Sequence, residues 1–125
     1  MPDPSQVLVV DDNARMVALI QRWLVRAGYQ VIGVTTVQEA LKALTADGIT
    51  WVITDLMMPT GNGMDILAYA RNHHPEAKII IMTAFGSDAM RQQAFARGAY
   101  AFLSKPFSGE ALLATLTQDP SSDPG

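Results

Sequence analysis

The segment VLVVDDN at residues 7–13 joins four consecutive apolar residues to two aspartates. Its length and its β-branched content are typical of a buried strand. Further apolar runs of the same kind follow at residues 31–34, 51–53, 79–82 and 100–103. Three of the five runs lack apolar–polar alternation, which is typical of strands with both faces buried in a parallel sheet. We therefore expect five parallel strands with helices covering both faces.

Amphipathic segments separate these runs. They predict helices at residues 14–27, from Thr36 to near Gly48, at residues 64–72, at residues 87–97, and from Ser108 to before Pro120. In the fourth of these helices, Met90, Ala94 and Phe95 are expected to face the core. A β–α pattern repeated five times implies right-handed crossovers and a three-layer αβα domain.

The length of 125 residues fits a single domain. We expect this domain to occupy residues 1–118 and residues 119–125, which are rich in Pro and Ser, to form a linker or a frayed tail. No run is long enough to span a bilayer and the first residues do not resemble a signal peptide, so a cytoplasmic protein without membrane contact is expected. A net charge of −3 argues against direct nucleic-acid binding, and zero cysteines exclude thiolate metal sites.

Polar side chains follow four of the predicted strands. Asp11 and Asp12 come after the first strand, and Asp55 comes after the third. Thr83 follows the fourth strand, and Lys105 lies just beyond the fifth. Ligands of doubly wound sheets bind at the carboxyl ends of the strands. We therefore expect these side chains to form one site.

Three clustered carboxylates require compensation, since two like charges about 4 Å apart repel by about 4 kcal/mol at an effective dielectric of 20. Lys105 supplies one positive charge and a divalent cation would supply two. The alternative is protonation of a carboxyl group with a raised pKa. Because the available ligands are oxygens, we predict Mg²⁺, with Mn²⁺ able to substitute and Ca²⁺ less well suited.

A magnesium ion beside a lysine and a hydroxyl group is typical of phosphoryl transfer. Asp55 stands alone at the end of the third strand, in VITDLMMP, and is the candidate nucleophile. Asp11 and Asp12 would hold the metal ion. Thr83 would hydrogen-bond one phosphoryl oxygen, and Lys105 would pair with another.

The motifs VLVVDDN, VITDLMMP, IIIMTA and YAFLSKPF together resemble the receiver domain of two-component response regulators, the CheY-like family, from about residue 6 to residue 116. The resemblance implies a flavodoxin-like fold with strand order 2-1-3-4-5. It implies phosphorylation of Asp55 by the phosphohistidine of a sensor histidine kinase or a phosphotransfer protein. It also implies that Met57 adds a backbone carbonyl to the metal ligands, and that the Lys105–Pro106 peptide bond is cis.

The same resemblance implies a conformational switch at Thr83, Phe102 and Pro106. The aromatic switch residue, often Tyr in such domains, is here Phe102, so the switch would work by packing rather than by a hydroxyl hydrogen bond. Phosphorylation would reshape the face formed by the fourth helix, fifth strand and fifth helix, near Arg91 and Arg97. That face would control an output domain C-terminal to this chain or a partner, or would form a homodimer.

Two other functions fit parts of the pattern. A Mg²⁺-dependent phosphatase of the haloacid dehalogenase type would use the aspartate after the first strand, but it needs a second aspartate where this sequence has Asn13, and a cap domain as well. A flavodoxin-like cofactor binder would place a phosphate where Asp11 and Asp12 repel it. We therefore predict a signalling domain that assists its own phosphorylation and dephosphorylation, rather than an enzyme.

Several residues near these motifs have simpler or weaker interpretations. Met57 and Phe85 are larger and more apolar than the residues many receivers carry there, and we hypothesise that they screen the phosphoryl group from water. His73 and His74 are interpreted as residues at the solvent end of the third helix. Residues 61–63, GNG, are interpreted as a flexible loop that leads into that helix.

Overall fold

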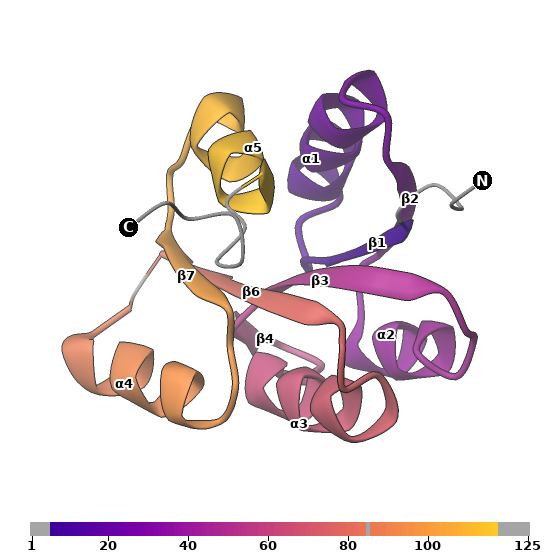
Figure 1. The fold of residues 1–125 in the computed structure, drawn as a ribbon. Coiled ribbons are helices and arrows are strands. Elements are labelled where there is room, and N and C mark those ends of the chain that lie inside the picture. The colour runs from indigo at the N-terminus through magenta and orange to yellow at the C-terminus, as the bar shows by residue number, and fades with distance from the viewer. Residues whose placement is uncertain (1–5, 85, 118–125) are drawn as a thin grey trace, which may run out of the picture.

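The computed structural model describes residues 6–84 and 86–117. One parallel sheet has the strand order β2-β1-β3-β6-β7 (Figure 1). Its strands are β1 (Gln6–Val10), β2 (Gln30–Val34), β3 (Ile49–Asp55), β6 (Lys78–Thr83) and β7 (Ala101–Ser104). Counted along the chain within this sheet, the order is 2-1-3-4-5, so the flavodoxin-like prediction is confirmed.

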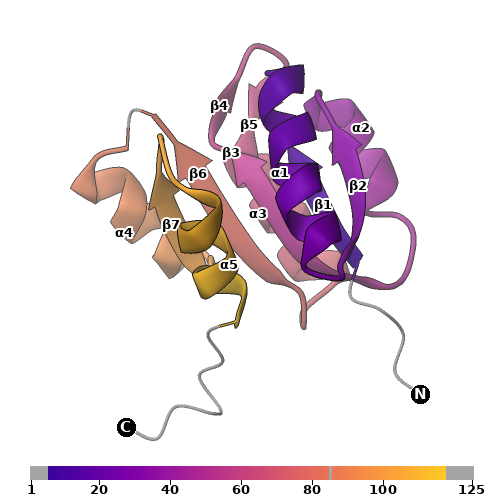
Figure 2. The same cartoon turned by 90° about the horizontal axis from the view of Figure 1, so that it is seen from above.

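Helices cover both faces of the sheet. One face carries α1 (Ala14–Arg26) and α5 (Gly109–Thr117), and the other carries α2 (Val37–Ala43), α3 (Gly63–His73) and α4 (Asp88–Ala96) (Figures 1 and 2). In the first four helices a polar side chain caps the N-terminus by accepting backbone N–H bonds. Among the described residues, no helix has the length and hydropathy needed to cross a bilayer.

The hydrophobic core forms two layers, one on each side of the sheet. Ile79 and Ile81 of β6 pack into the layer under α2, α3 and α4, whereas Ile80 and Met82 pack into the layer under α1 and α5. Successive strand side chains point to opposite faces, so a strand without polar alternation fills both layers. This arrangement explains why the run at residues 79–82 is continuously apolar.

The two tryptophans pack in the core layer under α1 and α5. Trp23 of α1 lies against the start of α5, where a Cβ on Gly109 would come within 2.9 Å of its ring, and its centroid is 6.4 Å from that of Phe107. Trp51, near the amino end of β3, is 7% exposed and meets Tyr100 edge to face at 5.4 Å. Both are packing residues.

The fourth helix differs from the prediction at Phe95. Ala94 is buried and Met90 is partly buried, but the Phe95 side chain is 41% exposed. Its ring is covered by the guanidinium of Arg91, which lies 5.6 Å from the ring centroid. The expectation that Phe95 faces the core is therefore wrong. Ala94 and Phe95 are adjacent on the helix, so only one of them can point squarely at the sheet.

A two-stranded antiparallel hairpin follows β3. It pairs β4 (Met57–Met58) with β5 (Gly61–Asn62), and α3 begins directly afterwards. The Thr60 hydroxyl at its turn accepts a hydrogen bond from the Val37 backbone N–H at 3.2 Å, which ties the hairpin to the start of α2. Residues 61–62 therefore form a short strand and Gly63 begins α3, so the interpretation of residues 61–63 as a flexible loop is wrong. Similarly, α2 ends at Ala43, several residues before Gly48.

Candidate functional site

The carboxyl ends of β1 and β3 bring together three aspartates. Val10 pairs with Thr54 in the sheet, so Asp11 and Asp55, the next residues on each strand, emerge side by side. Asp12 follows Asp11 on the loop into α1. One carboxylate oxygen of each aspartate lies within 4.8 Å of the others. Asp11 and Asp55 are buried and Asp12 is exposed, so the cluster has one open side.

Lys105 bridges two of these carboxylates. Its Nζ donates to Asp11 Oδ2 at 2.6 Å and to Asp55 Oδ2 at 3.2 Å. The Lys105 backbone N–H also donates to the Thr83 carbonyl at 2.8 Å, which fixes the residue against the end of β6. The Lys105–Pro106 peptide bond is cis, as predicted. The lysine beyond the last strand is thus placed inside the acidic cluster.

For both Asp55 and Lys105, burial shifts the pKa in one direction and the oppositely charged partner shifts it in the other. Burial raises the pKa of Asp55 above its ordinary value of 3.8, and the nearby Asp11 charge raises it further, while Lys105 opposes the shift without cancelling it. For Lys105, burial alone would lower the pKa, but the hydrogen bond and charge of Asp11, with the charge of Asp55, outweigh burial and raise it above 10.5. Lys105 is therefore a permanent cation at neutral pH.

An open cavity of about 360 Å³ lies above these groups. Besides the three aspartates and Lys105, it is lined by Asn13, Met57, Thr83 and Ala84. The Met57 side chain is 55% exposed, in contrast to the buried Met58 beside it. All the residues predicted to bind metal or phosphoryl group therefore line one cavity, whereas the predicted switch residues Phe102 and Pro106 do not.

The donor set of this cavity fits a hard divalent cation. Three carboxylates at the ends of two neighbouring strands offer oxygen ligands only, the type that Mg²⁺, Mn²⁺ and Ca²⁺ prefer. Only one of the three carboxylates is exposed, so an ion could keep water on the open side. The single ammonium of Lys105 leaves two of the three negative charges without compensation, which favours a dication.

Gly63 is a site residue that sequence reasoning missed. Its N–H donates to the Leu56 carbonyl at 2.7 Å, and a Cβ at this position would collide with the Asp55 carbonyl oxygen and come within 3.0 Å of the Leu56 Cα. The N-terminus of α3 therefore packs directly on the backbone of the candidate phosphoacceptor. The GNG motif was visible in the sequence, but this close approach depends on how the hairpin folds back.

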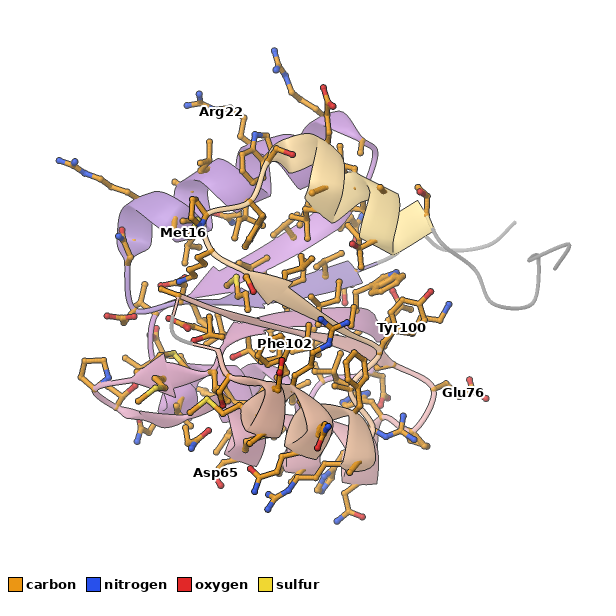
Figure 3. The ribbon with its side chains drawn as sticks, turned by 90° about the vertical axis from the view of Figure 1, so that its left-hand side faces the viewer. Met16, Arg22, Asp65, Glu76, Tyr100 and Phe102 are labelled. Atoms are coloured by element: carbon orange, nitrogen blue, oxygen red, sulfur yellow. The ribbon has the colours of Figure 1, made fainter. Side chains whose placement is uncertain are left out.

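Phe102 lies behind the cavity on β7. It is partly buried against the core layer of α2, α3 and α4, and Figure 3 shows it between α4 and α5. A Cβ on Gly86 would lie 2.7 Å from Phe102 Cε1 and 2.9 Å from Thr83 Cγ2. The Phe102 ring and Thr83 thus pack against the same glycine. Phe85, the other proposed screening residue, lies outside the described residues.

The two histidines have different environments. His73 is exposed and stacks on Tyr69, with ring centroids 3.8 Å apart. His74 is partly buried, and its Nε2 lies 2.6 Å from the Leu44 carbonyl oxygen, which links the end of α3 to the end of α2. Both residues lie at the end of α3, as predicted, but only His73 is exposed to solvent.

Comparison with known proteins identifies the family. Residues 7–117 match the family model of the response regulator receiver domain, so the chain belongs to that family. It is similar to the transcriptional regulatory protein GlrR of Escherichia coli, with 33% identity over 109 residues, which make up 87% of this chain and 24% of GlrR. The chain thus spans about a quarter of the length of this relative.

Solved structures show the same fold. A Burkholderia pseudomallei response regulator, described with a phosphorylated aspartic acid, a calcium ion and citrate, has a TM-score of 0.86 at 32% identity and covers 94% of this chain and 69% of its own. The beryllofluoride-activated NtrC4 receiver domain, described as a dimer, has a TM-score of 0.82 at 32% identity and covers 89% of this chain and 92% of its own.

Proposed function

We propose that this receiver domain accepts a phosphoryl group on Asp55 from the phosphohistidine of a sensor histidine kinase or a phosphotransfer protein. The observation that carries the proposal is the position of the Asp55 carboxylate. It lies at the floor of an open cavity, with the acidic pair beside it and the Lys105 ammonium 3.2 Å away. A phosphorylated aspartate in the Burkholderia relative supports the same chemistry.

In this reaction a carboxylate oxygen of Asp55 attacks phosphorus and forms the acyl phosphate bond. The phosphorus–nitrogen bond to the donor imidazole breaks, and its electron pair returns to the ring nitrogen, which takes up a proton. Lys105 would pair with one phosphoryl oxygen, and Thr83, which lines the same cavity, would donate a hydrogen bond to another. Both groups offset charge on the phosphoryl oxygens.

We assign the metal ligands to Asp11, Asp12 and Asp55, with the backbone carbonyl of Met57 as a fourth. Mg²⁺ is the proposed ion, and Mn²⁺ may substitute, since both accept oxygen ligands in octahedral geometry. When bound, such an ion neutralises negative charge on the carboxylates and on the incoming phosphoryl group. The cluster of three aspartate oxygens supports this assignment.

The output is a change in the face formed by α4, β7 and α5. Thr83 and Lys105 would follow the phosphoryl group, and Phe102 and Pro106 would shift with them. The exposed Phe95 and Arg91 on α4 give this face an apolar and cationic surface suited to a protein partner. We propose an output domain C-terminal to this chain or a second receiver as that partner, in the cytoplasm.

The test is phosphorylation with a small-molecule donor. With acetyl phosphate and Mg²⁺, intact-mass measurement should show one added phosphoryl group on wild type and on Asp47→Asn, an exposed carboxylate outside the site. Asp55→Asn should show none. Unlabelled wild type, or equal labelling of Asp55→Asn, would refute the proposal.

A further inference from the structure

Thr54 places a hydroxyl group in an apolar row of side chains that crosses the sheet. Thr54 is fully buried, and it pairs with Val10 of β1 and Ile81 of β6. The row continues to Val34 at one end and Phe102 at the other. These four neighbours belong to, or pack against, the core layer under α2, α3 and α4. A valine would fill the same volume without burying a polar group, so packing does not require the hydroxyl.

The Thr54 hydroxyl donates a hydrogen bond to the backbone carbonyl of Asp55 at 2.9 Å. We propose that Thr54 is a positioning residue for phosphoryl transfer: its hydroxyl holds the main chain of Asp55 so that the carboxylate keeps the geometry needed to attack phosphorus. Thr54 does not line the cavity of the described site, so it acts through Asp55. This inference rests on the proposed function, because it concerns the same reaction.

The peptide unit between Asp55 and Leu56 is held at both ends. Its oxygen accepts the Thr54 hydroxyl, and its N–H donates to the Met82 carbonyl at 2.9 Å. Gly63 packs against the same oxygen, since a Cβ there would collide with it. The peptide unit is planar, so it moves only by rotation about the bonds to its two Cα atoms. Loss of the hydroxyl removes one of the two hydrogen bonds that oppose this rotation.

A rotation of this peptide unit would disturb the site on both sides. The Asp55 carboxylate is attached at one end, and the chain at the other end leads through Leu56 to Met57, whose carbonyl we assign to the metal ion. Reacting atoms must approach to about 3–3.5 Å in the correct orientation, and a misplacement of about 1 Å can slow a reaction about a hundredfold. A buried hydrogen bond suits this role because its strength is not reduced by water.

The first test separates the hydroxyl from the methyl group of Thr54. Thr54→Val keeps the volume and removes the donor, whereas Thr54→Ser keeps the donor and removes the methyl group. With acetyl phosphate and Mg²⁺, Thr54→Val should be labelled about fivefold or more slowly than wild type, and Thr54→Ser within about twofold of wild type. Thr54→Ser leaves a cavity and should lose stability, so a role in packing alone would slow this variant as well. Thr54→Val at the wild-type rate, or Thr54→Ser as slow as Thr54→Val, would overturn the proposal.

Thr50 provides the matched control on the same strand. Its hydroxyl also donates to a backbone carbonyl, that of Gln6 at 3.2 Å, but it is exposed and lies near the amino end of β3, away from the site. Thr50→Val should be labelled at the wild-type rate. A loss of rate equal to that of Thr54→Val would show a general effect of removing a hydroxyl from β3, and would overturn the proposal.

The second test uses the unmodified protein and needs neither a variant nor phosphorylation. Burial and a hydrogen bond slow the exchange of a hydroxyl proton with water, so NMR should detect the Thr54 hydroxyl proton and should not detect that of the exposed Thr50. A Thr54 hydroxyl proton that exchanges as fast as that of Thr50 would overturn the proposal. Wild type without label on Asp55 would refute the proposed function, whereas equal labelling of wild type and Thr54→Val would refute this inference alone.

Discussion

Gly63 packs against the backbone carbonyl of Asp55, and no side chain larger than hydrogen fits between them. The residue before it, Asn62, caps α3 by accepting the Met64 N–H at 2.8 Å. The end of β3 and the start of α3 are therefore locked together at the proposed phosphoacceptor. The position of the Asp55 carboxylate depends on a residue that takes no part in the chemistry.

Gly63→Ala should destabilise the domain and slow phosphorylation together. The added methyl group must push the start of α3 away from Asp55, and overpacking of this kind costs about 1–3 kcal/mol. Gly28→Ala is the control, because a methyl group there meets no atom within 4 Å. Its cost comes only from the backbone, whose φ is +98°. It should lose about 1 kcal/mol and keep the wild-type rate with acetyl phosphate. Equal phosphorylation rates for both variants would contradict this role of Gly63.

Asp55→Asn should stabilise the protein at neutral pH. Burial raises the pKa of Asp55 above 3.8 in the folded state, so the unfolded chain loses this proton first, and the free energy of unfolding falls as pH rises from 3.8 through the folded-state pKa. Above that window the variant should be more stable than wild type, because it carries no buried charge at this position. Urea unfolding across the acid range should show the difference disappearing below pH 3.8, while Asp47→Asn follows wild type throughout.

Met57→Asn should shorten the lifetime of the acyl phosphate. The Met57 side chain lines the cavity and is 55% exposed, so it can cover the phosphoryl group, whereas an amide could position an attacking water. Loss of phosphate from purified phosphoprotein measures the rate directly. Val25→Asn, which replaces an apolar side chain that is 60% exposed on α1, should decay like wild type. Wild type decaying as fast as Met57→Asn, or faster, would exclude screening.

Phe95→Ala should weaken association of the activated domain without loss of stability. Its ring is 41% exposed on α4, so truncation should change the unfolding free energy by less than about 0.5 kcal/mol. Sedimentation with beryllofluoride and Mg²⁺ should show a dimer of wild type and of Val25→Ala, which alters the opposite face of the sheet. If Phe95→Ala dimerises as wild type does, the α4 face is not the contact.

The main elements could be predicted because the signals are local. The apolar runs fix the strands, and parallel pairing then brings their carboxyl ends to one edge, so Asp11 and Asp55 meet without any knowledge of side-chain packing. The position of Lys105 at this edge could be predicted in the same way, because it directly follows β7. The sequence could not predict which of the two aspartates the Lys105 ammonium approaches more closely. The shorter contact, to Asp11, depends on the conformation of the loop after β7.

Features that depend on distant contacts could not be predicted. His74 meets the carbonyl of Leu44, which lies 30 residues earlier. Phe95 satisfies helical periodicity as well as Ala94 does, and only the position of α4 on the sheet decides between them. The hairpin of β4 and β5 has strands of two residues each, too short to leave a periodic pattern.

The packing of Trp23 on Gly109 and Phe107 gives the domain its own optical reporter. Phe107 and Gly109 lie two and four positions after Lys105, so a rearrangement that reaches α5 changes the surroundings of the Trp23 indole ring. Trp51 is buried in the same core layer and also emits. Emission from the unlabelled protein can therefore time the response of α5 to activation at Asp55, with Trp51→Phe isolating the responsive fluorophore.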